Sequence, residues 1–452
     1  MLTRYQQKFY YAYVCCMLLI FSPFNGLAYL SPFVFLLFLI SEKETNLSLY
    51  FIKRLSWFMI VIWSLFFLYK NIYTVFNPPS FWLSCITYSS FYPLLFIQFD
   101  KLKSELLLDK IAKFSRSVFF IEGCIGVTQA VYGFSQTGSF DTSNGDFVEG
   151  TIHLPLNSEL SFSNPMFSAN MISLAVFLII YYLRKGSFSK GFLLLPGLFS
   201  IILASVLHQI ALLIGSFILA LFLIPNVKFG EINWNYIKKY IIYGVVILLV
   251  PISILLRHNL NGLIEIPKEI ITNDSKNIPK AIVTAHALFD LPRDEPASVF
   301  FGLGPGQFSS RAALIMSGYY FGGPSNPKTL PFIDSNVNEL ADKYVISTLI
   351  RFHNVAYFGS SQKPFYSILS VYTEFGLIGI LFVIIWIVIQ ILRGRRCIVQ
   401  SKSRSTIFSV LGVFILILFV FFLGVQVNYY EVVQAIFLSV LITILLKSQY
   451  KY

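Results

Sequence analysis

A glycine-rich segment at 301–323 carries the residue pattern best suited to chemistry. Its alternating glycines allow tight turns that expose backbone N–H groups: Gly302, Gly304 and Gly306. Ser309 or Ser310 can cap a short helix that begins at Arg311. A glycine-rich loop leading into a helix N-terminus binds anions, and a neighbouring arginine adds a bidentate phosphate contact. The segment therefore predicts a diphosphate clamp, with a glycine-rich turn beside a solvated arginine as the alternative.

Four arginines lie in the polar stretch around this segment: Arg257, Arg293, Arg311 and Arg351. A guanidinium group holds phosphate in two places, and a pyrophosphate leaving group needs such stabilisation where negative charge develops. The alternative is ordinary ion pairing with acidic residues of the same stretch, which we expect for at least two of the four.

Two further residues could take part in proton transfer. His353 follows a helical pattern over 333–352, and a histidine can accept a proton from a hydroxyl nucleophile near neutral pH. Glu374 lies inside an apolar run, where an ionisable group is a functional hypothesis by default. The alternatives are a surface histidine near polar headgroups and a capped structural glutamate. His208 and His286 are rival histidines, for which packing is the favoured role.

Neither a metal site nor a cofactor is predicted. The five cysteines have no metal-like spacing with histidine, and none lies in the large polar stretch, so no disulfide framework is expected there. A phosphate-loop lysine motif, a nucleophile elbow and a zinc signature are all missing from the sequence. The energy for any reaction must then come from the substrate itself or from an ion gradient.

Transmembrane helices are the elements that must position these residues. Apolar residues make up 56% of the 452 residues and charged residues only 12%, against roughly 25% charged residues in globular domains. Since a helix needs ~20 apolar residues to cross the hydrocarbon core, we predict an all-α polytopic membrane protein with about twelve transmembrane helices. The expected spans are 9–24, 27–40, 55–76, 81–99, 117–135, 166–183, 192–207, 210–225, 240–256, 366–391, 406–425 and 433–446.

Lysine and arginine favour one alternating set of the loops between these spans. That set includes Arg4, Lys8, the basic stretch 393–404 and Lys447, whereas the other short loops hold only Lys70. The positive-inside rule makes the first set cytoplasmic, so both termini are expected in the cytoplasm. This distribution indicates membrane topology, rather than a nucleic-acid partner, as the reason for the net charge of +12.

Three regions follow from these expectations. Residues 1–256 hold the first nine spans, with an acidic outer loop at 136–165. Residues 257–365 form a large loop on the periplasmic or extracellular side, which we expect to hold short helices and to bind substrate and carry catalytic residues. Residues 366–452 hold the last three spans.

Two short motifs stand in a distinctive order along the chain. Many spans precede a large outer loop with the sequence GLGPGQF, which begins at Gly302. A re-entering helix then has the sequence YSILSVYTEFGLIGIL, with a Glu-x-Gly-Leu-x-Gly pattern from Glu374 to Gly379. This order resembles the O-antigen polymerase and O-antigen ligase superfamily, which contains Wzy-like and WaaL-like proteins. An Arg-x10-Gly pattern associated with some polymerases runs from Arg293 to Gly304 and recurs after Arg311.

The resemblance implies metal-independent glycosyl transfer at the outer face of a bacterial inner membrane. The donor would be a glycan on undecaprenyl diphosphate, and the acceptor hydroxyl would belong to another lipid-linked repeat unit. Arg311, with Arg293 or Arg351, would hold the diphosphate, and His353 or Glu374 would assist proton removal. Membrane lipid and a chain-length regulator are the other partners that the resemblance implies, and nucleic acid is not among them.

Other functions compete with a polymerase. A ligase would transfer the glycan to the lipid A–core, but ligases of this family usually carry a Ser-Arg pair where this chain has His208 and Gln209. A polysaccharide flippase or other multi-span transporter comes from a different class. The long outer loop and the few charges at the membrane midplane favour an enzyme over a transporter. A receptor or a structural membrane protein is the remaining alternative.

Overall fold

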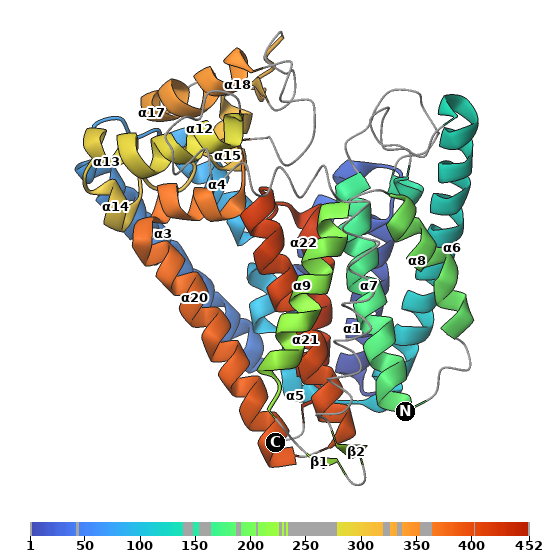
Figure 1. The fold of residues 1–452 in the computed structure, drawn as a ribbon. Coiled ribbons are helices and arrows are strands. Elements are labelled where there is room, and N and C mark those ends of the chain that lie inside the picture. Colours follow the sequence, from blue (N-terminus) through green and yellow to red (C-terminus); the bar gives the residue numbers. More distant parts are fainter. Residues whose placement is uncertain are drawn as a thin grey trace.

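Helices form nearly all of the structure, a computed structural model (Figure 1). It describes residues 2–41, 45–138, 148–152, 164–186, 191–204, 207–225, 228–229, 232–233, 278–319, 326–331, 337–352, 364–401 and 403–450. The β-structure within this part is one antiparallel pair, β1 (Lys228–Phe229) with β2 (Ile232–Asn233). The predicted all-α class is confirmed.

Five helices in the described part of the chain are long and apolar enough to cross a membrane. They are α3 (Thr45–Ile72), α6 (Glu105–Thr137), α7 (Asn164–Lys185), α20 (Ser367–Ser401) and α21 (Arg404–Gln426). Shorter helices accompany them: α1 (Arg4–Ile20), α2 (Ser31–Ile40), α5 (Phe99–Leu102), α8 (Leu195–Leu203), α9 (Leu207–Leu223) and α22 (Val433–Lys447). The chain is thus a multi-pass membrane protein.

Some of the expected spans are divided in the structure. The expected span 81–99 is the helix α4 (Pro78–Ser89) followed by a 3₁₀ turn at Tyr92–Phe96, because Pro93 has no N–H to continue an α-helix. The expected span 192–207 begins as another 3₁₀ turn before the short helix α8. The expected span 240–256 lies outside the described residues.

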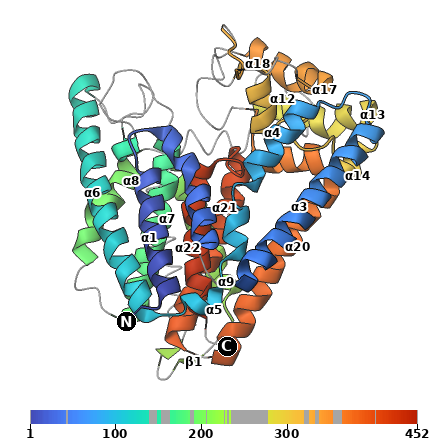
Figure 2. The same cartoon turned by 180° about the vertical axis from the view of Figure 1, so that it is seen from behind.

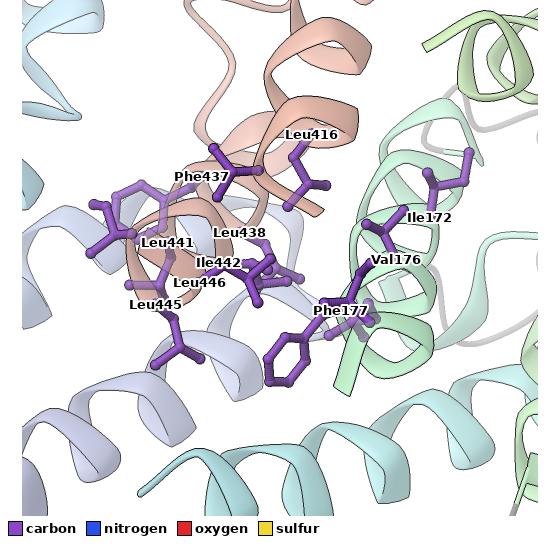
Figure 3. Close-up of a cluster of buried hydrophobic side chains, with 14 of the residues drawn as sticks. Ile172, Val176, Phe177, Leu416, Phe437, Leu438, Leu441, Ile442, Leu445 and Leu446 are labelled. Atoms are coloured by element: carbon purple, nitrogen blue, oxygen red, sulfur yellow. The ribbon is translucent and has the colours of Figure 1, made fainter. Parts of the chain in front are cut away.

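Apolar side chains of α7, α21 and α22 fill the centre of the helix bundle (Figure 3). The labelled members of this core are Ile172, Val176, Phe177, Leu416, Phe437, Leu438, Leu441, Ile442, Leu445 and Leu446. A polar contact also crosses between helices, since Asn170 Nδ2 donates to the carbonyl oxygen of Gln434 at 2.6 Å. Interhelical hydrogen bonds of this kind help to hold helices together in lipid. The packing of α21 and α22 in the bundle therefore fixes both ends of the short connection between them.

The helices α3 and α20 incline away from this bundle in both views (Figures 1 and 2). Their flanks carry large exposed apolar side chains, such as Trp63 and Phe67 on α3 and Phe382 and Trp386 on α20. In a membrane this exposure is to lipid. The helix α20 is interrupted at Gly376, where φ is 65° and ψ is −162°.

The short helices predicted for the large loop gather at the end of the molecule opposite both termini (Figure 1). They are α12 (Pro279–Ala285), α13 (Leu291–Asp294), α14 (Ser298–Phe301), α15 (Arg311–Met316), α17 (Glu339–Ala341) and α18 (Ser347–Arg351). The amphipathic pattern over 333–352 is helical over 339–351, with a π turn at Asp342–Ile346. Its cap is Asn338, whose side chain accepts from the backbone N–H of Leu340. The caps expected from the sequence, Asp334 and Ser335, lie outside the described residues.

Candidate functional site

The break in α20 creates an attachment point for the glycine-rich loop. A helix that stops at Gly376 leaves the preceding carbonyl groups without helical donors. The loop supplies them, because Leu303 N donates to Thr373 O at 2.8 Å and Gly304 N donates to Glu374 O at 2.9 Å. The GLGPGQF segment and the TEFG segment, which the sequence singled out separately, therefore form one structural unit.

Glycine is required where these two backbones meet. Gly302 has φ of 68°, and a Cβ atom added there would lie 2.2 Å from the carbonyl carbon of Glu374. Two tyrosines of the α3 end fix the same stretch. Tyr69 donates its hydroxyl to Phe301 O at 2.8 Å, and Tyr73 donates to Gly302 O at 2.6 Å. The loop is thus held between the end of α3 and the break in α20.

The carboxyl group of Glu374 occupies the centre of the glycine-rich loop. Glu374 is fully buried. Its Oε2 accepts from Gly306 N at 2.8 Å, and its Oε1 accepts from Ser310 N at 3.1 Å and from Phe308 N at 3.5 Å. Backbone N–H groups converging in this way form an anion-binding concavity. The converging N–H groups of the loop are therefore occupied by a carboxyl group of the protein itself.

This arrangement bears on the predicted diphosphate clamp. The N–H of Gly302 donates to Ser298 O at 2.8 Å, and those of Gly304 and Gly306 both donate to Glu374, one to its carbonyl oxygen and one to its carboxyl group. In this conformation all three glycine amides already have acceptors within the protein. The charged side chain next to the loop in the sequence is that of Arg311.

A buried glutamine fastens the loop to its other neighbours. Gln307 Oε1 accepts from Asn77 N at 2.7 Å and from Asn338 Nδ2 at 3.1 Å, and Gln307 Nε2 donates to Asn77 O at 2.8 Å. Asn338 Nδ2 also donates to Val75 O at 2.6 Å. These bonds join the loop to the turn before α4 and to the cap of α17.

A second buried carboxyl group, Glu431, lies in the connection between α21 and α22. Its Oε1 accepts from Arg311 N at 3.1 Å and from Asn428 Nδ2 at 3.4 Å, and its Oε2 lies 3.1 Å from Thr87 Oγ1. Burial raises the pKa of Glu431, and the hydrogen bond and charge of Arg311 oppose that rise. Glu431 is not among the residues predicted from the sequence, although a lone acid between two apolar spans is a usable signal.

The two carboxyl groups accept from two consecutive backbone N–H groups. The N–H of Ser310 donates to Glu374, and the next N–H along the chain, that of Arg311, donates to Glu431. The guanidinium group of Arg311 is partly buried and lies 6.0 Å from the centre of the Tyr29 ring. We call Glu374, Glu431 and Arg311 the carboxyl–arginine cluster. It lies where the short helices of the large loop meet α4, α20 and the α21–α22 connection.

Other predicted site residues lie elsewhere or cannot be placed. Arg293 is exposed at the end of α13, with its Nη1 3.4 Å from Asp290 Oδ1. Arg351 is exposed at the end of α18, with its guanidinium carbon 5.2 Å from the centre of the Phe352 ring. His353 and Arg257 fall outside the described residues. Of the predicted site residues, the structure thus brings together Glu374, Arg311 and the three glycines, and it places Arg293 and Arg351 on the surface.

The rival histidines have separate surroundings. His286 Nδ1 lies 2.7 Å from Asp290 Oδ2, and its ring packs against Tyr344 with 4.9 Å between ring centres. His208 lies at the start of α9, and its Nε2 is buried. In the part of the chain that the structure describes, no group of three His, Cys, Asp or Glu side chains could hold a metal ion.

Comparison of the chain with protein-family models, with curated proteins and with solved structures gives no match.

Proposed function

We propose that this protein polymerises undecaprenyl-diphosphate-linked oligosaccharide repeat units at the outer face of a bacterial inner membrane. The observation that supports this best is the carboxyl–arginine cluster, whose two carboxyl groups are buried at the junction between the loop helices and the helices of a multi-pass chain. A junction of this kind offers proton-exchanging groups and a cation to a substrate whose lipid lies in the membrane. In this proposal the chain crosses the membrane about twelve times, with both termini in the cytoplasm and the large loop in the periplasm.

The reaction is a metal-independent glycosyl transfer. The acceptor hydroxyl oxygen forms a bond to the anomeric carbon of the donor, the bond from that carbon to the diphosphate oxygen breaks, and the hydroxyl proton leaves. Arg311 stabilises the charge that develops on the departing diphosphate. A carboxyl group of the cluster exchanges the proton. Arg293 or Arg351 would extend the diphosphate site from the loop surface, His353 is the rival proton acceptor, and a chain-length regulator is the proposed protein partner.

A gel of surface glycan from a strain that lacks this chain, beside one that carries it, tests the proposal. A polymerase predicts that the long ladder is lost while a single repeat unit is still attached to its acceptor. An unchanged ladder would overturn the glycan-assembly function as a whole.

Two alternatives give different results on the same gel. If the protein is a ligase, all transferred glycan is lost and polymer accumulates on the lipid carrier. If it is a flippase, single lipid-linked units are trapped on the cytoplasmic side. The buried carboxyl pair favours keeping a proton-coupled transporter as the second candidate, because intramembrane acids are frequent in proton relays.

A further inference from the structure

We propose that α13, α14 and the π turn before them, His286–Asp290, anchor the large loop to the membrane. Their exposed apolar side chains lie in the lipid leaflet on the side opposite both termini. This anchoring needs only the multi-pass architecture and not the proposed reaction. We call these exposed side chains the anchor face: Leu288, Phe289, Phe300 and Phe301.

The anchor face is too apolar for a surface that meets only water. Its four large side chains are between 42% and 59% exposed. Neighbouring side chains of the same segment are buried instead: Ala287, Leu291 and Ser298. The segment thus packs one set of side chains into the loop and leaves a second, apolar set uncovered. Exposed apolar patches of this kind mark contact with a membrane or with another protein.

The position of the anchor face points to the membrane, because it continues the lipid-facing flanks of α3 and α20. A Cβ atom added at Gly376, where α20 is broken, would lie 2.2 Å from Phe300 O, so the end of α14 lies directly beside α20. Tyr69, near the end of α3, donates its hydroxyl to Phe301 O at 2.8 Å. Both views show α13 and α14 at the ends of these two helices (Figures 1 and 2). The exposed side chains that follow the break in α20 are also apolar: Leu377, Ile378, Leu381 and Phe382. Lipid that covers α3 and α20 therefore also reaches the anchor face.

The length of α3 gives a second, independent reason. Between Arg54 and Lys70, residues 55–69 of α3 are uncharged. They rise roughly 22 Å as a helix, which is less than the ~30 Å of a hydrocarbon core. A hydrophobic stretch shorter than the core needs the bilayer to thin or flanking side chains to reach its surface. Apolar side chains of α14, which Tyr69 attaches to the end of α3, cover the remaining depth.

Cationic side chains border the anchor face. Lys70 follows Tyr69 in the last turn of α3, and the side chain of Arg293 on α13 is 79% exposed. Long cationic side chains beside an embedded apolar surface extend toward the lipid phosphates at the membrane surface. The combination fits a phospholipid leaflet, whose hydrocarbon meets the apolar side chains and whose phosphates meet the cations.

This anchoring fixes the depth at which the glycine-rich loop begins. The helix α14 ends at Phe301, and the loop begins at the next residue, Gly302. Contact with lipid therefore holds the start of the loop, while Gln307 and Glu374 hold the rest of it from within the protein.

Spin-label accessibility of the purified full chain in phospholipid nanodiscs tests the proposal without any glycan. The nitroxide is attached to Phe289→Cys or to Phe300→Cys. In the background protein Cys15, Cys85 and Cys124 are replaced by alanine, and the two buried cysteines remain. Molecular oxygen concentrates in the hydrocarbon of a bilayer, whereas a polar nickel chelate stays in water, so the two reagents report the surroundings of each label.

Two control positions define the scale. Phe382→Cys places the label on the lipid-facing flank of α20, and Asp342→Cys places it at an exposed charged position of the large loop. We expect the labels at Phe289 and Phe300 to collide with oxygen several-fold more often than with the chelate, as at Phe382, and the label at Asp342 to show the reverse. Free access of the chelate to both anchor positions would overturn the proposal. Low access of both reagents would also overturn it, because protein, such as a second copy of this chain, would then cover the face.

A pair of substitutions checks the same contact without a label. Phe289→Asp places a charge in the hydrocarbon and should lower the melting temperature in nanodiscs, whereas Phe289→Leu should not. An unchanged melting temperature in Phe289→Asp would mean that the side chain lies in water and would contradict the anchoring. This pair still tests the proposal if the cysteine background fails to fold. Neither measurement needs polymer, so failure of the anchoring is distinguishable from failure of the proposed function.

Discussion

Lys280 donates its ammonium group to the carbonyl oxygen of Gln426, the last residue of α21, at 2.6 Å. This bond joins α12, in the large loop, to the end of a helix of the bundle. A cation at a helix C-terminus is favoured by the partial negative charge of the free carbonyl groups. The ammonium group also lies 4.8 Å from the centre of the Tyr366 ring. A single buried lysine thus fixes the loop helices to the bundle next to the connection that carries Glu431.

Because of Lys280, the free energy of unfolding should vary with pH in the alkaline range. Burial lowers its pKa from 10.5 to about 8. Between these two values the unfolded chain binds more protons than the folded chain, so the free energy of unfolding should rise as pH increases from about 8 to 10.5. Below pH 8 the cost of burying the charge, on the order of 3 kcal/mol, is fully present. Thermal unfolding of wild type and Lys280→Met from pH 7 to 10.5 checks this, because the variant should lack that part of the rise. Equal pH slopes in the two proteins would contradict it.

Arg311 should be essential for glycan output if the proposed function is right. Arg311→Ala, at normal protein level, should abolish the long ladder, and Arg311→Lys should restore it only in part, because a point charge replaces a bidentate fork. Arg396→Ala is the matched control, since Arg396 is an exposed arginine near the far end of α20. Unchanged polymer in Arg311→Ala would remove the central residue of the proposal.

Gly306 should tolerate no side chain. Its φ is 78°, and an added Cβ atom would lie 2.1 Å from the carbonyl oxygen of Ser80. Gly306→Ala should therefore destabilise the protein by about 1–3 kcal/mol or more, seen as a lower melting temperature. Gly215→Ala is the control, because nothing lies within 4 Å of the added Cβ and an alanine in a helix stabilises by up to about 1 kcal/mol. Equal melting temperatures for the two variants would contradict the close contact between Gly306 and Ser80.

Gln307 should contribute more to stability than its polar side chain suggests. Gln307→Leu removes the acceptor of the buried Asn77 N–H, at a cost of about 1–3 kcal/mol, and one of the donors to the Asn77 carbonyl oxygen, which still accepts from Phe81 N. The melting temperature should fall, whereas Gln7→Leu, at an exposed position of α1, should change little. Similar effects of the two substitutions would mean that Gln307 does not hold the loop.

The local features of the site could be predicted from the sequence, whereas the contacts between residues far apart in the sequence could not. A glycine-rich loop before a capped helix predicts an anion site, and of this pattern the structure confirms the cap, since Ser310 Oγ accepts from Ala313 N at the start of α15. The group that the loop holds could not be predicted from a local pattern, because Glu374 is 68 positions from Gly306. That pairing depends on the break in α20 at Gly376. The presence of a glycine in an apolar helix does not by itself predict such a break.

Glu431 was not predicted as a site residue for a different reason. It lies in a short connection between two apolar helices, where the lone acid is visible in the sequence but its contacts are not. Its importance follows only from the folding of α4, α15 and the α21–α22 connection around it, which are far apart in the sequence. The divided spans had a local signal in their prolines, so they were more predictable than the carboxyl pair.

The break in α20 also sets the depth of the site in the bilayer. Below the break, residues 377–392 are uncharged up to Arg393. These residues rise roughly 24 Å as a helix, which is less than the ~30 Å of a hydrocarbon core, and an inclined helix covers even less of it. The first turns of α20 must then complete the crossing, and Glu374 comes to lie close to the lipid–water boundary instead of the midplane. Headgroup oxygens and water meet the protein at that level, so protons can reach the carboxyl pair without a channel through the bilayer.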